Sequence, residues 1–361
     1  MKHRQIGLGK VGVINPDGHA IGLDIGATTV RAAILTPGTL DGRPSVTVHG
    51  LGAVALPSGA VVNGMVSDQR ALTEAVRHLW QANGFNCRHV ILGIANQQVL
   101  VRDLQMPAMS PQQLVKALPF QAREVVALPM DQVVLNFTPL GAPDPDTNLV
   151  RGLLVATPRE PVLAAVAAVE RAGLKVARVD LASFAALRSI ADEQRAVEAV
   201  IDLGAHLTTI VIHNRGIPKL VRTLARGGQE LTDRLAGKLD LSVQQAEQVK
   251  MTNGLTGAQD GVATALHEGV RPLLAEIRSS LGYFSSTNDG ARVERISLTG
   301  GGAALPGLAD ALSKQAAVPT TVVTPMRHIR NRWASKEMRR PEEAELFASA
   351  VSVGLAMGAA A

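Results

Sequence analysis

The sequence predicts an α/β protein of two similar lobes, with a small α+β subdomain inserted into the first lobe. Two stretches, 20–36 and 199–213, share one pattern: an apolar strand with a single Asp, an Asp-x-Gly turn and a second apolar strand. This pattern predicts that each lobe begins with the same kind of β-hairpin. From 97 to 175 the sequence changes to short strands alternating with capped helices, which predicts the insertion.

The composition is that of a folded chain with more than one subdomain. The 361 residues are 46% hydrophobic and 19% charged, which is typical of soluble globular proteins. The formal charge is +5, but no basic run is interleaved with aromatic residues, so nucleic-acid binding is not predicted. The single cysteine, Cys87, excludes an internal disulfide and a Cys-rich zinc site.

Neither end of the chain predicts a targeting or membrane-spanning segment. The basic start of the chain is followed by a short apolar run broken by three glycines, which is a poor signal sequence. Gly7–Gly12 satisfies G-x-G-x-x-G, but no strand precedes it and a turn at Asn15-Pro16 follows, so we expect a leader segment and no dinucleotide site. Residues 346–361 carry no charge but are too short and too weakly hydrophobic to span a membrane, so we expect a packed helix.

The first lobe and the insertion follow from local signals. In the lobe we expect the hairpin 20–36, a strand at 46–56, a helix from an N-cap at Asp68 to residue 82, and a buried strand at 90–95. In the insertion, capping boxes at 110–113 and 157–160 predict helices that extend to residues 126 and 172. The remaining insertion elements are strands at 99–104, 133–137 and 151–156.

The second half repeats the opening hairpin and then becomes helical. We expect helices at 229–238, after the Ser242–Gln245 capping box, and over 262–285. A buried strand at 293–298 runs into Gly300–Gly302, and a helix, a strand at 320–323, a basic loop and the final helix follow.

The two Asp-x-Gly turns suit a metal-bound polyphosphate. Backbone N–H groups and hydroxyls of such a turn can bind an anion. Asp24 and Asp202 would repel phosphate directly, but each can hold Mg²⁺ through water, and the metal then neutralises the phosphates. Three glycines before a helix let the backbone approach a base and ribose closely.

Taken in this order, the motifs resemble those of the actin/Hsp70/sugar-kinase superfamily, whose members have two duplicated lobes around an ATP cleft. The details resemble the FtsA-like branch and, within it, the PilM-type pilus assembly proteins. The stretches that carry this resemblance are Ile94–Val99, Leu118–Phe120, Leu128–Met130, Val133–Phe137, Ala172–Leu174, Val179-Asp180, Arg222, Gly227-Gly228, Ala246-Glu247, Lys250 and Leu298–Gly302.

The resemblance implies a two-lobed actin-like ATPase fold and a set of site residues. Phosphate binding would fall to Asp24, Gly26, Ala27, Thr28, Thr29, Arg31, Asp202, Gly204, Ala205, His206 and Thr208. Adenosine binding would fall to Gly228, Glu247, Lys250, Gly300, Gly301, Gly302 and Leu305. Asp24 and Asp202 would hold hydrated Mg²⁺, and His206 has a surface position as its alternative.

The resemblance also implies a division of the chain. The segments are a leader (1–19), the first lobe with the phosphate-1 hairpin (20–96), the inserted 1C-like subdomain (97–175), the inter-lobe connection (176–198), the phosphate-2 hairpin (199–226), a 2B-like small subdomain (227–290), the remaining second lobe with the adenosine loop (291–345), and a C-terminal helix packed on the first lobe (346–361).

The function implied is that of a cytoplasmic ATP-binding scaffold of type IV pilus biogenesis or a related secretion machine. Such a protein would dock the N-terminal tail of a PilN-type inner-membrane protein near 99–104 and 133–137, and would meet the membrane only through partners. Other pilus components and self-association are further expected contacts. Asp180 is the single weak candidate for a catalytic base, because the helix after it has no Glu or Gln in the usual position, so ATP hydrolysis is expected to be slow at most.

Two alternatives remain open at this stage. A sugar or small-molecule kinase would use the same cleft, but the first lobe offers no convincing catalytic Asp. An FtsA-like filament protein would end in a basic amphipathic helix, whereas the last sixteen residues here are uncharged. The basic cluster before them is predicted to be a solvated loop, with a membrane surface or an acidic partner as the alternative: Arg327, Arg330, Arg332, Lys336, Arg339 and Arg340.

Overall fold

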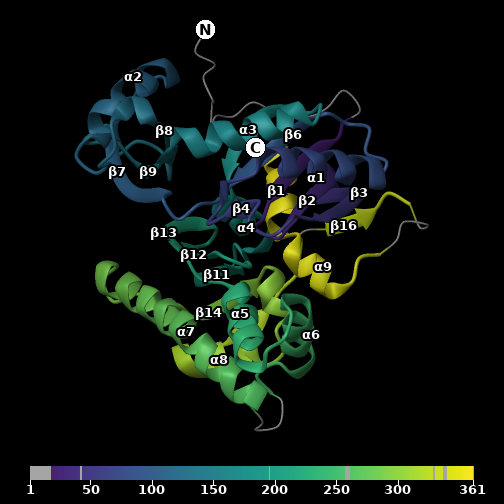
Figure 1. The fold of residues 1–361 in the computed structure, drawn as a ribbon. Coiled ribbons are helices and arrows are strands. Elements are labelled where there is room, and N and C mark those ends of the chain that lie inside the picture. Colours follow the sequence, from purple (N-terminus) through teal and green to yellow (C-terminus); the bar gives the residue numbers. More distant parts are fainter. Residues whose placement is uncertain are drawn as a thin grey trace.

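The computed structural model describes residues 18–40, 43–194, 196–256, 261–327, 330–335 and 340–360. Gly7–Gly12, Lys336 and Arg339 lie outside these ranges. Two large sheets dominate the fold (Figure 1). The first sheet contains β1 (Ala20–Ile25), β2 (Thr29–Leu40), β3 (Arg43–Ala55), β6 (His89–Ile94), β10 (Lys175–Leu181) and β16 (Arg330–Trp333); the second contains β11 (Val197–Leu203), β12 (Thr208–Asn214), β13 (Ile217–Leu224), β14 (Arg295–Thr299) and β15 (Thr320–Val322).

The two sheets share one topology. The order β10-β6-β1-β2-β3 in the first lobe corresponds to β15-β14-β11-β12-β13 in the second. In both, the first three strands along the chain form antiparallel hairpins, and the other two add in parallel. The expected repeat of one hairpin-led unit is therefore present as two lobes of an α/β fold.

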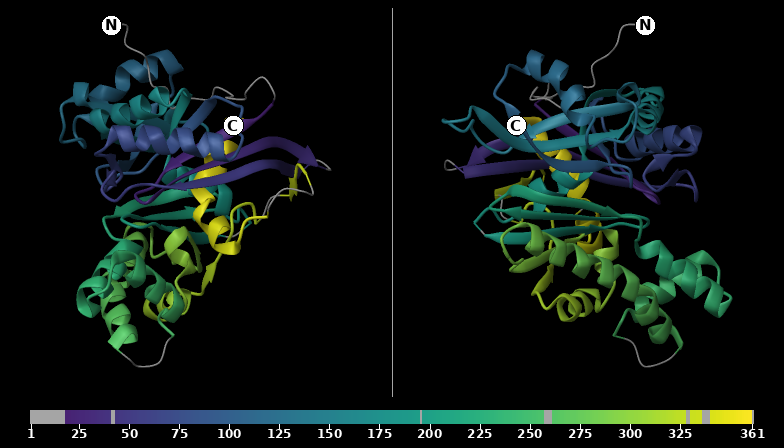
Figure 2. Two further views of the ribbon diagram at one scale, coloured as in Figure 1. Left: turned by 45° about the vertical axis from the view of Figure 1, so that its right-hand side comes forward. Right: turned by 90° about the vertical axis from the view of Figure 1, so that its left-hand side faces the viewer.

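Helices and sheets alternate in five layers, and Figure 2 shows the two sheets one above the other. The outer layer of the first lobe is α1 (Gln69–Ala82) and α3 (Arg159–Arg171), which share one apolar core with the first sheet. Between the two sheets lie α4 (Ala182–Ile190) and α10 (Ala350–Met357). Below the second sheet lie α5 (Gly228–Leu239), α6 (Val243–Asn253), α7 (Gly261–Thr287) and α8 (Leu308–Ala316).

The middle layer is packed closely through glycine. A Cβ on Gly22 of β1 would overlap the carbonyl of Ser352 in α10, and a Cβ on Gly354 of α10 would overlap the backbone of Ala185 in α4. The missing side chains let the C-terminal helix lie directly against the strand that carries Asp24.

The insertion is smaller than expected. Its sheet, in the order β7-β9-β8, packs one face on α2, and the elements are β7 (Leu100–Pro107), α2 (Pro111–Ala122), η1 (Met130–Gln132), β8 (Val133–Pro139) and β9 (Leu149–Pro158). The expected end at residue 175 is wrong, because α3 packs into the first-lobe core through Val162 and Val169. Residues 175–181 likewise form β10 of the first sheet, although 176–198 were expected to connect the lobes.

Three predicted helix starts are confirmed and one is wrong. Asp68, Ser110 and Ser242 each accept hydrogen bonds from backbone N–H groups in the first turn of their helices. Thr157 does not cap α3, because it continues β9 and its hydroxyl accepts a hydrogen bond from the side-chain Nδ2 of Asn96 at 3.2 Å. The helix after Ser110 ends at Ala122, before the expected residue 126.

The C-terminal segment departs from the expected loop and single helix. Within the predicted basic loop, β16 pairs in parallel with β3 at the edge of the first sheet. The chain then forms α9 (Glu343–Ala348), α10 and η3 (Gly358–Ala360), while the minor elements β4 (Val61–Val62), β5 (Met65–Val66) and η2 (Gly301–Ala304) complete the fold. Among the helices of the described ranges, none has the length and apolar composition that a membrane crossing requires.

Candidate functional site

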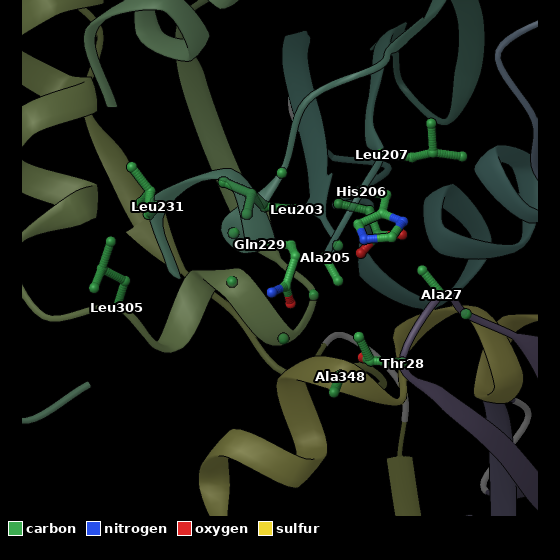
Figure 3. A pocket seen from close by; sticks show the side chains of 18 of the residues that line it. Ala27, Thr28, Leu203, Ala205, His206, Leu207, Gln229, Leu231, Leu305 and Ala348 are labelled. Carbon is green, nitrogen blue, oxygen red and sulfur yellow. The ribbon is translucent and has the colours of Figure 1, made fainter. Parts of the chain in front are cut away.

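A cavity of about 760 Å³ lies between the lobes, and residues of both hairpins line it (Figure 3). Strand alternation explains how both aspartates reach it. In β1, Ile21 and Leu23 pack outward on α1 and α3, so Asp24 belongs to the opposite face, toward the second lobe. In β11, Ile201 packs on the outer core, so Asp202 belongs to the face toward the first lobe.

The two turns have the same hydrogen bond. The N–H of Gly26 donates to the carbonyl of Thr29 at 3.0 Å, and the N–H of Gly204 donates to the carbonyl of Leu207 at 2.9 Å. A Cβ on either glycine would lie 2.9 Å from that carbonyl oxygen. Glycine is therefore required in both turns, which explains why the Asp-x-Gly pattern recurs.

Side chains from the two turns face each other across the cavity. Figure 3 places Ala27 and Thr28 of the first hairpin opposite His206 of the second. Arg31 lies opposite Asp24 in the β1–β2 register and also lines the cavity. The site thus combines small turn residues with one arginine and one histidine, a set suited to an anionic ligand.

The paired carboxylates are electrostatically unfavourable without a cation. Burial raises the pKa of Asp24 from 3.8 to about 6, although the Arg31 guanidinium opposes the shift. Burial and then the charge of Asp24 raise the pKa of Asp202 from 3.8 to about 7, again against Arg31. A divalent cation near both groups would favour their ionised forms, and carboxylate oxygen is the donor that Mg²⁺ prefers.

The described residues contain no group of three or more His, Cys, Asp or Glu side chains arranged to hold a metal. Two carboxylates alone do not form a metal cage. They suit Mg²⁺, which usually keeps several waters and binds proteins through one or two carboxylates together with substrate phosphates. The donor set therefore fits a magnesium ion brought with a phosphate ligand.

The start of α5 fixes the second turn from behind. The N–H groups of Gly228 and Gln229 donate to the carbonyls of Gly204 and Ala205 at 3.0 and 2.9 Å. A Cβ on Gly227 would overlap the Ala205 carbonyl, so this contact needs glycine. The second turn is consequently held in one backbone conformation.

A buried lysine stabilises the same region. Lys250 of α6 is 6% exposed, and its Nζ donates to the carbonyl of Gly228 at 3.1 Å, to Thr232 Oγ1 at 2.8 Å and to Glu247 Oε2 at 2.7 Å. Its three donors are thus satisfied within the protein. Lys250 positions Gly228 and Glu247, and Glu247 lines the cavity.

The triple glycine closes the site beside Asp202. Gly300 has φ +88°, and a Cβ there would overlap the carboxylate of Asp202. Its N–H donates to the carbonyl of Phe347 in α9 at 3.0 Å. The glycine loop therefore approaches Asp202 closely and is tied to the C-terminal helices, as its sequence indicated.

Comparison with known proteins decides the family. The model of the family described as type IV pilus assembly protein PilM matches residues 22–360. The chain belongs to the PilM family. The expected assignment to this family, within the FtsA-like branch of the actin-like superfamily, is confirmed.

Similar proteins agree with this membership. The cell division protein FtsA of Bacillus subtilis is 26% identical over 260 residues, or 65% of this chain and 58% of FtsA. FtsA of Pseudomonas aeruginosa is 27% identical over 258 residues, or 64% of this chain and 60% of FtsA. The chain thus spans less than two thirds of the length of these two relatives.

Solved structures confirm the actin-like ATPase fold. The PilM-PilN type IV pilus biogenesis complex contains a chain with a TM-score of 0.80 and 26% identity, over 95% of this chain and 98% of that one. The ethanolamine utilization protein EutJ of Carboxydothermus hydrogenoformans has a TM-score of 0.54 and 16% identity, over 95% and 92%, which shows the fold alone.

The PilM-family fold brings most of the predicted site residues into one cavity. The predicted residues that line it are Asp24, Gly26, Ala27, Thr28, Arg31, Asp202, Gly204, Ala205, His206, Gly228, Glu247, Lys250, Gly300, Gly301, Gly302 and Leu305. Thr29 contributes its carbonyl to the first turn, and its side chain is not part of the lining. Thr208 is fully buried, and its hydroxyl donates to the carbonyl of Arg226 at 2.8 Å.

Asp180 is not part of this site. Its carboxylate forms ion pairs with Arg188 at 2.8 Å and Arg178 at 3.6 Å, and it does not line the cavity. The helix α4 instead presents Ala182 to the cavity. Two positions after Asp180, Ala182 therefore offers a methyl group where a base could have stood.

Sequence reasoning missed several lining residues. Gly64, with φ +78°, fits against the Ala95 carbonyl, where a Cβ would overlap. The Asn63-Gly64 pair is a strong turn signal that could have identified it. Gln229, Gln244, Gln248 and Met251 also line the cavity, and no local pattern separates them from ordinary surface residues.

Proposed function

We propose that this PilM-family protein is an ATP-binding scaffold of type IV pilus assembly that holds Mg-ATP between its lobes and docks the cytoplasmic tail of a PilN-type membrane protein. The observation that carries the nucleotide part is the pair of matching Asp-x-Gly turns that line one cavity. The cavity volume of about 760 Å³ lies within the range of ligand sites in proteins.

The residues present fit the nucleotide. Gly26 and Gly204 allow the two tight turns that line the cavity, and Arg31 supplies positive charge for phosphate oxygens. Asp24 and Asp202 would hold the hydrated Mg²⁺, which when bound neutralises phosphate charge. Glu247 and the glycine loop Gly300–Gly302 would hold the ribose and base.

Slow hydrolysis at most fits this lining. Among the described residues of the first lobe, the polar side chains that line the cavity are Asp24, Thr28 and Arg31. Asp24 is assigned to the metal, and Asp180 is engaged by two arginines outside the cavity. Without a positioned base, a loss of about 10²–10⁴ in rate is ordinary. The bound nucleotide would serve to hold the two lobes together.

The partner site is proposed at the junction of the insertion with the first lobe. In the order β7-β9-β8, strand β8 has β9 on one side only, and Figure 1 places β8 on the side of the insertion that faces α3. An extended peptide can add to such an edge through backbone hydrogen bonds. The likeness to the PilM-PilN complex supports a PilN-type tail as this peptide. Attachment to the inner face of the membrane would follow from this docking.

One experiment tests the docking part. Photo-crosslinking residues are placed at Asn136 on β8 and, as a control, at the exposed Tyr283 on α7, and the N-terminal peptide of a PilN-type protein is added with and without Mg-ATP. We expect crosslinking at position 136 and not at 283. Equal crosslinking at both positions, or none at either, contradicts the docking site.

The nucleotide part has its own test. Asp24→Ala removes one carboxylate from the metal position, so the affinity for Mg-ATP should fall at least tenfold while the circular dichroism spectrum stays unchanged. Unchanged affinity contradicts the proposal.

A further inference from the structure

Helix α6 lines the cavity with a row of long, mostly polar side chains. Residues 244, 247, 248 and 251 of α6 follow the i, i+3, i+4, i+7 spacing of a single helix face, and all four line the cavity. The buried face of the same helix is formed by Ala246 and Lys250. The helix therefore turns a stripe of two glutamines, a glutamate and a methionine toward the enclosed space.

The two glutamines of this stripe have no assigned use. Gln245 belongs to the capping box of α6, and its side-chain oxygen accepts from the N–H of Ser242 at 3.0 Å. Gln244 and Gln248, by contrast, have no hydrogen-bond partner among the described residues. They stand about 6 Å apart along the helix axis. Two free carboxamides at the rim of a cavity offer donors and acceptors to a ligand.

The surroundings of these carboxamides suit a flat heterocycle. Met251 and the buried Leu305 and Leu308 line the same cavity and give it apolar walls. Glu247, held by Lys250 and Thr232, lies between the two glutamines along the helix. A nucleobase has apolar faces and a polar edge, so apolar walls combined with amides at the rim match its chemistry.

We infer that Gln244 and Gln248 read the edge of a purine base and accept both 6-amino and 6-oxo purines. This inference rests on the proposed nucleotide site. A carboxamide can turn about its last torsion angle and present either its N–H₂ or its C=O group. Both side chains are exposed and unpartnered, so no contact in the described structure fixes one orientation. They can therefore pair with the donor and acceptor pattern of either purine.

The expected size of the effect follows from ordinary hydrogen bonds. One such bond contributes a factor of about 2–10 in affinity. Wild-type protein should thus bind Mg-ATP and Mg-GTP with dissociation constants within about tenfold of each other. Replacing both glutamines should weaken both nucleotides by about 5- to 50-fold.

The test is calorimetric titration of the full chain with Mg-ATP, Mg-GTP and magnesium tripolyphosphate. The variants are Gln244→Met, Gln248→Met and the double variant, and Gln112→Met on the exposed start of α2 is the matched control. Methionine keeps the length of the side chain and removes its hydrogen-bonding groups. We expect the double variant to lose affinity for both nucleotides and to keep its affinity for tripolyphosphate, which has no base.

Each other outcome contradicts the inference in an identifiable way. A wild-type preference for one purine above about tenfold overturns the permissive readout, and unchanged nucleotide affinity in the double variant overturns the role of the glutamines. Equal losses for tripolyphosphate mean that the substitutions disturb the phosphate site and that base recognition is not their role. Wild-type protein that binds none of the three ligands refutes the proposed function itself.

Discussion

Replacing Asp202 by Asn should stabilise the nucleotide-free protein while it weakens Mg-ATP binding. Asp202 lies at the end of β11 beside the glycine loop, and burial together with the charge of Asp24 raises its pKa from 3.8 to about 7. The folded state therefore disfavours the ionised carboxylate relative to the unfolded chain. Asparagine keeps the shape of the side chain and removes the charge.

The size and the pH dependence of this stabilisation follow from the difference between the folded and unfolded pKa values of Asp202. A rise from 3.8 to about 7 corresponds to about 4 kcal/mol when the group is fully ionised, and partial exposure of Asp202 reduces this to about 2–4 kcal/mol. Because the folded pKa is the higher one, the penalty is complete above pH 7 and disappears as the pH falls toward 3.8. The advantage of the variant should be largest at pH 8 and less than half as large at pH 5.

The assay is urea unfolding followed by circular dichroism at pH 8 and pH 5, without nucleotide and with Mg-ATP. Asp131→Asn, on the exposed η1, is the control and should change the free energy of unfolding by less than about 0.5 kcal/mol. With Mg-ATP, wild type should gain more stability than Asp202→Asn. A variant no more stable than wild type at pH 8, or stabilised equally at both pH values, refutes the electrostatic account of this cleft.

Three further predictions follow from other contacts. Glu198 is fully buried, and although burial raises its pKa, hydrogen bonds from His213, Ser297 and the Asp192 N–H together with the charge of Arg295 lower that pKa to about 2. The ionised carboxylate should therefore contribute about 3 kcal/mol to the free energy of unfolding above pH 4.5, and this contribution should be lost as the pH falls toward 2. In urea unfolding, Glu198→Gln should remove this acid dependence. Gly26→Ala and Gly204→Ala should each weaken Mg-ATP at least tenfold in a fluorescent-nucleotide titration, because the new Cβ would lie 2.9 Å from a turn carbonyl; an effect at one glycine only would contradict the equivalence of the two turns. Lys250→Met should destabilise the protein by about 1–3 kcal/mol and weaken Mg-ATP, because Gly228, Thr232 and Glu247 lose their shared donor, whereas Lys238→Met on the surface of α5 should change neither quantity.

Local chemistry predicted the elements whose signals are local. The caps at Asp68, Ser110 and Ser242 form as expected, because each depends on one side chain and the next three residues. Thr157 failed as a cap because its pairing with Val134 of β8 holds it in the extended conformation of β9. The short strand β16 has no signal of its own, since only its pairing with the distant β3 makes it a strand.

The residues of the candidate site likewise divide into those that local sequence predicts and those that it does not. The Asp-x-Gly turns were predictable because the glycine, the aspartate and the strand period all appear within a few residues. The side chain of Thr208 was placed wrongly, because its hydroxyl satisfies the Arg226 carbonyl inside the second lobe. Gln244 and Gln248 could not be identified from sequence, since an exposed helix face that meets a cavity has the same composition as one that meets water.

The most direct test of the central claim is the dependence of nucleotide binding on magnesium. Isothermal titration calorimetry of wild-type protein with ATP, in the presence of Mg²⁺ and again with excess EDTA, measures it at constant pH and ionic strength. With the paired carboxylates of Asp24 and Asp202 in the cleft, ATP should bind at one site with Mg²⁺ and at least tenfold more weakly without it. Equal affinity in both conditions, or no binding in either, would contradict a Mg-ATP site between the two hairpins.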